Sequence, residues 1–107
     1  MTPARQADAE LDALIEEITV DCYDEDEQLT GFEAAFDEDG SFPCAGTVIG
    51  EQVEVLHIGQ GDGRRELIAA CQRHGRRYEI ALLDIDIDAD PATSRLLAAY
   101  RRWAGAR

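Results

Sequence analysis

The chain has 107 residues, 45% of them hydrophobic, and a formal net charge of −13. This length suits a single domain with a modest core, and the apolar content excludes a wholly disordered chain. The negative charge disfavours nucleic acid and anionic membranes as partners, because both bind positively charged protein surface.

The N-terminus has no apolar stretch that resembles a signal peptide, and no apolar run approaches the roughly 20 residues of a membrane span. Cys22, Cys44 and Cys71 are an odd set without C-x-x-C spacing, which is typical of reduced, mostly buried thiols. We therefore expect a cytoplasmic protein in which residues 1–7 form a disordered tail and residues 8–107 form a single domain.

Acidic residues dominate the first third of the chain. Fourteen Asp and Glu residues, and no Lys or Arg, lie between Asp8 and Asp39. Beyond Gly40, nine acidic residues are balanced by nine arginines, so the excess charge is confined to the first third. Repulsion among these carboxylates destabilises a compact state unless a positively charged partner binds or screens them. Ca²⁺ is one such partner, since it coordinates clustered carboxylate oxygens. The alternative is a solvated acidic surface that maintains solubility.

Two helices are predicted in this acidic third. The first begins near Asp8, and its apolar stripe consists of Leu11, Leu14, Ile15 and Ile18. The second covers about residues 25–36, because Asp24 followed three residues later by Glu27 is typical of a helix N-cap. Its buried face is expected to contain Leu29, Phe32, Ala35 and Phe36. Residues 37–43 are predicted to form a loop.

β-Branched residues predict strands at the start of the second half. The first two cover residues 47–49 and 52–58, with Gly50 between them. Because side chains alternate along a strand, Val53 and Val55 share one face, and His57 is expected to join them.

Two further extended segments follow. The first covers residues 65–73, and a hairpin at His74-Gly75 connects it to the second, which covers 78–87. One face of the first segment carries Leu67, Ala69 and Cys71. Strands of this length favour a small antiparallel sheet or a partly open barrel.

The last element is a helix. Asp90-Pro91 predicts its start, with Asp as the cap and Pro at the first helical position. Its apolar stripe consists of Leu96, Leu97, Tyr100 and Trp103. The predicted fold class is therefore α+β, with two acidic N-terminal helices, a small antiparallel sheet or partly open barrel, and a C-terminal helix.

The acidic clusters are candidate metal ligands, but none of them matches an EF-hand. That loop requires Gly at position 6 and Glu at position 12. Counting from Asp84 gives Ala89 and Arg95 at these positions, and counting from Asp24 gives Leu29 and Ala35.

Each cluster also has a purely structural interpretation. If residues 83–88 are extended, Asp84, Asp86 and Asp88 share one strand face, where charge would deter pairing between sheet edges. The carboxylates around residues 21–27 would form a helix cap and a solvated face. A helix separates them from the acidic residues at 37–39, so the two groups are not expected to bind one ion together.

Other chemistry is poorly supported. His57, His74 and the three cysteines match no zinc-ligand spacing. The acidic neighbours of Cys22 disfavour a thiolate nucleophile. The glycines at 59–63 lack the Lys-Ser/Thr ending of a phosphate-binding loop. We therefore expect no catalytic activity.

Several segments of the chain occur in a specific order and spacing. They are ITVDCY at 18–23, the acidic run ending at Gln28, Gly31-Phe32, Asp37-Glu38-Asp39, FP at 42–43, GEQVEVL at 50–56, ALLD at 81–84, and Tyr100 with Trp103. Together they resemble the cyanobacterial-type calcium-binding protein CcbP and its bacterial relatives, over residues 14–103.

This resemblance implies a small acidic protein that binds Ca²⁺ without an EF-hand, as a buffer or in calcium signalling, and without catalysis. The ligands that it implies are Asp21, Asp24, Glu25, Glu27, Asp37, Glu38, Asp39, Asp84 and Asp86. The alternative is an interaction module without specific metal binding, whose acidic helices would contact a basic protein partner.

Overall fold

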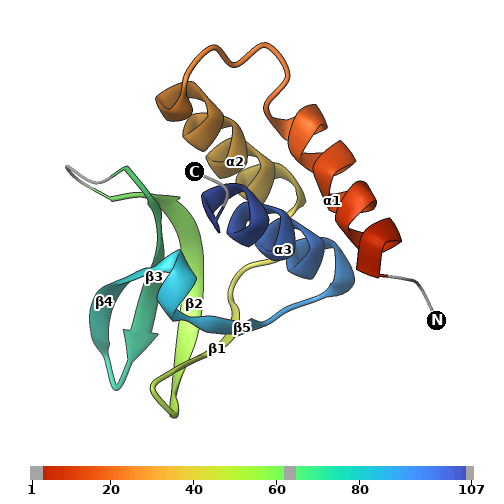
Figure 1. The fold of residues 1–107 in the computed structure, drawn as a ribbon. Helices are drawn as coiled ribbons and strands as arrows, with labels where there is room; N and C mark the ends of the chain where they lie inside the picture. Colours follow the sequence, from red (N-terminus) through yellow and green to blue (C-terminus); the bar gives the residue numbers. More distant parts are fainter. Residues whose placement is uncertain (1–3, 62–64, 106–107) are drawn as a thin grey trace.

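The computed structural model describes residues 4–61 and 65–105. In chain order the elements are α1 (Ala4–Ile18), α2 (Glu25–Asp39), β1 (Cys44–Val48), β2 (Glu51–Gln60), β3 (Leu67–Arg73), β4 (Arg76–Ala81), the 3₁₀ turn η1 (Leu82–Asp84), β5 (Asp86–Asp88) and α3 (Pro91–Gly105). Figure 1 shows that the helices gather on one side of the sheet. The predicted α+β fold, with its C-terminal helix, is confirmed.

The strands form one antiparallel sheet. Their order is β4-β3-β2-β1-β5, so that β2 lies in the centre and β4 and β5 lie at the edges. The edges do not pair with each other within the described part of the chain, and the sheet is therefore open rather than closed into a barrel. The predicted hairpin at His74-Gly75 connects β3 to β4 and is confirmed.

The core lies between the sheet and the helices α2 and α3. Its aromatic centre is formed by Phe32, Tyr100 and Trp103, with the ring centroids of Phe32 and Tyr100 5.6 Å apart in an edge-to-face arrangement. The Tyr100 hydroxyl accepts a hydrogen bond from the Leu67 N–H at 3.0 Å, and the Trp103 indole N–H donates to Gln28 at 2.8 Å. These bonds connect α3 to β3 and to α2 and satisfy the polar ends of the rings.

A β-bulge in β2 changes which side chains face the core. The register with β3 shifts between Val55 and His57. Val55 is buried as predicted, but His57 is exposed and Ile58 takes the buried position. An extra residue in one strand of a pair reverses the alternation beyond it, so the prediction that His57 shares a face with Val55 is wrong.

The two predicted helix caps are present. Asp24 accepts a hydrogen bond from the Glu27 N–H at 2.8 Å at the start of α2. Asp90 accepts one from the Thr93 N–H at 2.8 Å at the start of α3. Each cap satisfies a backbone donor that the first turn of a helix leaves free.

The helices and the β4–β5 connection differ from their predicted bounds. α2 continues to Asp39, so the acidic residues at 37–39 belong to its last turn and not to a loop. The extended segment predicted to end at residue 87 is interrupted by η1, which buries Leu82 and leaves Leu83 exposed. α1 begins at Ala4, inside the segment assigned to a tail, and residues 1–3 lie outside the described residues.

α1 is attached to the rest of the domain mainly through α3. Its apolar residues are only partly buried. The guanidinium of Arg102 binds both carboxylate oxygens of Asp12, at 2.7 and 3.1 Å, and lies 3.5 Å from Asp8. None of the helices in the described part of the chain has the length and apolar character that a membrane span requires.

Candidate functional site

The structure divides the predicted α2 ligands into two groups, one at each end of the helix. Asp21, Asp24, Glu25 and Glu27 lie at its N-terminal end, and Asp37, Glu38 and Asp39 lie in its last turn. With a rise of 1.5 Å per residue, the ends of this 15-residue helix are about 20 Å apart. A single ion therefore cannot contact both groups.

The N-terminal group already has structural roles. Asp24 caps the helix, and Glu27 accepts a hydrogen bond from the Tyr23 N–H at 2.9 Å. Asp26, a neighbour of this group, lies 3.9 Å from Arg65. Carboxylates at a helix N-terminus are also stabilised by the positive end of the helix dipole. Asp24, Asp26 and Glu27 thus have partners in the protein itself.

The C-terminal group has the opposite electrostatic environment. Asp37, Glu38 and Asp39 are exposed, and the last turn of α2 contains no basic residue. No ion pair among the described residues involves them. Negative side chains at a helix C-terminus are destabilised by the negative end of the dipole and by the free backbone carbonyls there. These three carboxylates therefore leave a charge that a cation would neutralise.

A hydrogen-bonded corner connects this end of α2 to the start of α3. Ser41 donates from its hydroxyl to Asp90 at 2.6 Å and from its backbone N–H to the buried Thr93 hydroxyl at 3.0 Å. Hydrogen bonds from the side chains of Ser41 and Thr93 hold the pKa of Asp90 below its ordinary value, because they stabilise the carboxylate. Figure 1 shows the end of α2 and the start of α3 on the same side of the molecule.

The remaining predicted ligands, Asp84 and Asp86, are exposed but do not form one row with Asp88. Asp84 belongs to η1, whereas Asp86 and Asp88 lie in β5, where they pair with Thr47 and Ala45 of β1. The predicted strand face of three carboxylates is therefore reduced to two, because the 3₁₀ turn takes Asp84 out of the alternation.

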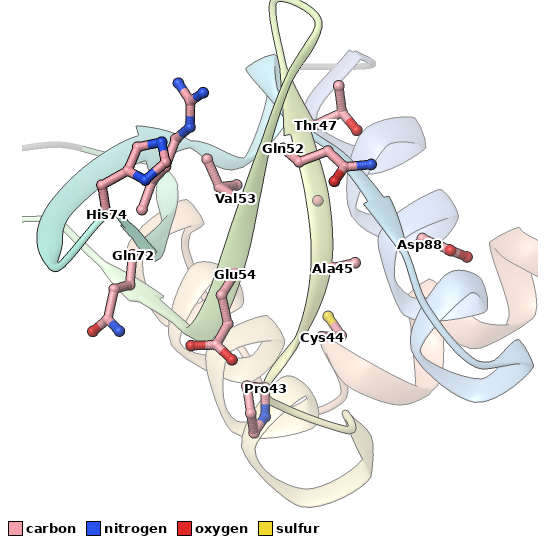
Figure 2. Close-up of a pocket in the computed structure, with 12 residues that line it drawn as sticks. Pro43, Cys44, Ala45, Thr47, Gln52, Val53, Glu54, Gln72, His74 and Asp88 are labelled. Carbon is pink, nitrogen blue, oxygen red and sulfur yellow. The ribbon is translucent and has the colours of Figure 1, made fainter.

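A hollow of about 710 Å³ lies over the outer face of the sheet (Figure 2). Its carboxylates are Glu54 and Asp88, and none of the nine predicted ligands lines it. Figure 2 shows the two carboxylates on opposite sides of β1, with one strand between them. Cys44 also lines the hollow, and the pKa of its thiol is raised by burial and by the negative charges of Asp88 and Asp90. The hollow therefore has neither the donors nor the arrangement of a calcium site.

The donor chemistry of the α2 ends fits a hard cation, since all of the predicted ligands offer carboxylate oxygens. In the described part of the chain, however, no group of three or more His, Cys, Asp or Glu side chains is arranged to hold a metal. Exposed carboxylates change rotamer readily, so the ligands would have to converge when the ion binds.

The sequence did not predict two hydrogen-bonded contacts between α2 or its C-terminal end and the rest of the domain. Ser41 connects α2 to α3 through Asp90, a residue 49 positions away. Glu33, in the middle of α2, accepts hydrogen bonds from the Gln60 backbone N–H at 2.9 Å and from its side chain at 3.2 Å. Neither pair has a local sequence signal, because the partners meet only when the sheet and helices pack.

Comparisons with known proteins agree with this architecture. A family model described as calcium binding, Calci_bind_CcbP, matches residues 12–104. The crystal structure of Anabaena CcbP is 23% identical, with a TM-score of 0.74, over 97% of this chain and 93% of that one. A calcium-binding protein in the calcium-binding form is 24% identical, with a TM-score of 0.79, over 98% of this chain and 97% of that one. No curated protein matches the chain.

The family match covers most of the chain and confirms the resemblance found in the sequence, together with Ca²⁺ as the expected ion. The two solved structures, at their low identities, establish the fold. The family is described by calcium binding rather than by a reaction.

Proposed function

The chain belongs to the CcbP family of calcium-binding proteins, and we propose that it is a Ca²⁺ buffer or sensor that binds the ion through exposed carboxylates of α2, without an EF-hand. The observation that carries the proposal is the last turn of α2, where Asp37, Glu38 and Asp39 are exposed and no basic residue is present. Bound Ca²⁺ would supply the positive charge that this helix end lacks.

The ligand chemistry of this turn suits Ca²⁺. The carboxylates of Asp37, Glu38 and Asp39 are hard oxygen donors, and the last carbonyls of a helix, which lack intrahelical partners, are donors of the same kind. Ca²⁺ accepts six to eight oxygens in flexible geometry, whereas Mg²⁺ requires near-ideal octahedral geometry and retains its waters. An exposed, adaptable group of carboxylates therefore favours Ca²⁺.

The N-terminal group is the second candidate location. Asp21 and Glu25 are exposed, while Asp24 and Glu27 each already accept a backbone hydrogen bond. Binding an ion there would compete with the cap of α2, and the helix dipole would repel the cation. We therefore rank this group, and Asp84 with Asp86, below the last turn of α2.

Calorimetric titration of chelator-stripped protein with Ca²⁺, in about 0.15 M salt and with Mg²⁺ as the control ion, tests the proposal. We expect saturable, stoichiometric heats for Ca²⁺ that Mg²⁺ does not reproduce. Weak heats that are the same for both ions would contradict it and would indicate a solvated acidic surface instead.

A further inference from the structure

Strand β4 forms an exposed edge of the sheet. It pairs with β3 on one side, and Arg76, Arg77, Tyr78 and Glu79 are all exposed. An edge strand presents a row of backbone N–H and C=O groups that can pair with another strand. We propose that β4 pairs in antiparallel fashion with β4 of a second copy of this chain, so that the two sheets join into one.

The hairpin that precedes β4 determines which backbone groups point outward. Its two turn residues, His74 and Gly75, both have positive φ, 52° and 77°, as in a type I′ turn. Such a turn is closed by a hydrogen-bonded pair, here Arg73 with Arg76. Hydrogen-bonded and non-hydrogen-bonded pairs alternate along an antiparallel ladder. Tyr78 therefore bonds to β3.

The residues on either side of Tyr78 have the opposite orientation. Arg77 and Glu79 form the non-hydrogen-bonded pairs with β3, so their N–H and C=O groups point to the open edge. These groups are the donors and acceptors that a second strand would use. Their side chains share the outer face of the sheet, because residues two apart in a strand lie on the same face.

Charge distinguishes the register centred on Tyr78 from the registers centred on its two neighbours. A two-fold axis through Tyr78 places Arg77 of each copy opposite Glu79 of the other, as a hydrogen-bonded pair. An axis through Arg77 would place Arg77 opposite Arg77, and an axis through Glu79 would place Glu79 opposite Glu79. Opposite charges across a strand pair stabilise it and like charges destabilise it. The sequence of β4 is therefore complementary to itself in charge when the axis passes through Tyr78.

The other properties of β4 agree with this arrangement. The Tyr78 side chain, 45% exposed, would face Tyr78 of the second copy across the axis, forming an aromatic cross-strand pair. Figure 1 shows β4 on the side of the molecule opposite α1, so the α1 helices of two copies would lie far apart. The like net charges of the copies would thus oppose the pairing least at this edge.

Sedimentation velocity from roughly 1 µM to 1 mM protein, in about 0.15 M salt, tests the proposal. We expect concentration-dependent dimers of the unaltered protein. Arg77→Glu and Glu79→Arg, tested separately, should each weaken self-association by about tenfold or more, because each places like charges opposite each other twice. Arg95→Glu is the matched control, since it makes the same charge change at an exposed position of α3 and should leave the dimer intact.

The two variants also rescue each other if the register is correct. An equimolar mixture of Arg77→Glu and Glu79→Arg should form heterodimers, and the double variant should form homodimers, because both restore opposite charges across the axis. A protein that stays monomeric up to about 1 mM overturns the proposal. The proposal is also overturned if a mixture of the two folded variants forms no heterodimers, or if Arg95→Glu weakens self-association as much as they do.

Discussion

Replacing Asp39 by Asn should have opposite effects on stability with and without Ca²⁺. Asp39 is the last residue of α2, where its charge opposes the helix dipole and no basic residue compensates it. Without the ion, Asp39→Asn should therefore raise the free energy of unfolding. When Ca²⁺ is added, the free energy of unfolding should rise less for the variant than for the unaltered protein, because the variant has lost a proposed ligand.

The expected magnitudes are measurable. A charge at a helix end changes stability by about 0.3–1 kcal/mol, which corresponds to a rise of roughly 2–6 °C in the melting temperature of a domain of this size. In the presence of Ca²⁺, each tenfold loss of affinity would remove about 1.4 kcal/mol of ion-dependent stabilisation. Urea unfolding in chelator and in saturating Ca²⁺ measures both effects in one protein preparation.

Asp26→Asn is the matched control. Asp26 has the same charge and lies in the first turn of the same helix, where the dipole stabilises it. This variant should lower stability in chelator by about 0.3–1 kcal/mol and leave the Ca²⁺-dependent increment unchanged. The reasoning is refuted if Asp39→Asn destabilises the ion-free protein, or if both variants retain the full increment.

Three further predictions concern the fold. Tyr100→Phe should lower the free energy of unfolding by about 1–3 kcal/mol in urea titrations, because a buried backbone N–H of β3 loses its acceptor. Ile49→Asn should raise the melting temperature by roughly 4–8 °C. Ile49 is 97% exposed and has a φ of 48°, which strains a β-branched residue, and the turn that it forms with Gly50 suits Asn-Gly. An unchanged melting temperature would contradict the idea that Ile49 is strained. Hydrogen bonds from Ser41 and Thr93 lower the pKa of Asp90 in the folded protein. This shift stabilises the fold at pH values above 3.8, the ordinary pKa of the group, and the stabilisation is lost as the pH falls through the lower pKa of the folded state. The stability difference between unaltered protein and Asp90→Asn should therefore shrink from about pH 7 to about pH 3, and a constant difference would contradict this.

Features with a local cause could be predicted from the sequence. The cap at Asp24 depends on Glu27, three residues away, and the cap at Asp90 depends on Thr93. The turn at His74-Gly75 is similarly determined by its own two residues. Such contacts form within one turn of the chain, and residue type alone is enough to predict them.

Features that depend on packing could not be predicted in this way. The bulge in β2 becomes visible only in its pairing with β3, and it reverses the expected orientation of His57. α2 continues to Asp39 although acidic residues are unfavourable there, because Phe36 is buried in the core and accepts a backbone hydrogen bond from Gly40. Tertiary contacts thus outweigh the local preference of the last turn.

The candidate site illustrates the same division. Charge density in the sequence marked the acidic segments around α2, and the resemblance to the family implies that they bind Ca²⁺. The structure adds that the two groups lie at opposite ends of one helix, about 20 Å apart, in opposite electrostatic environments. The bounds of α2 therefore decide which carboxylates can bind together.

Whether the protein buffers or senses Ca²⁺ depends on what the bound ion changes beyond its ligands. The corner of Ser41, Asp90 and Thr93 connects the proposed site to α3, and both oxygens of Asp90 already accept hydrogen bonds in it. An ion held by the last turn of α2 alone would leave this corner intact, whereas an ion that recruited Asp90 would remove the cap of α3.

An ion held by the last turn of α2 alone requires no change of fold, and we therefore favour the role of a Ca²⁺ buffer. Hydrogen exchange at the Thr93 N–H, which donates to Asp90, distinguishes the two roles. If the protein is a buffer, the Thr93 amide should be equally or better protected from exchange when Ca²⁺ binds. The Gly40 N–H, which donates to Phe36, serves as the reference amide at the end of α2. Faster exchange at Thr93 in saturating Ca²⁺ would instead mean that the ion opens the corner, which is the behaviour of a sensor.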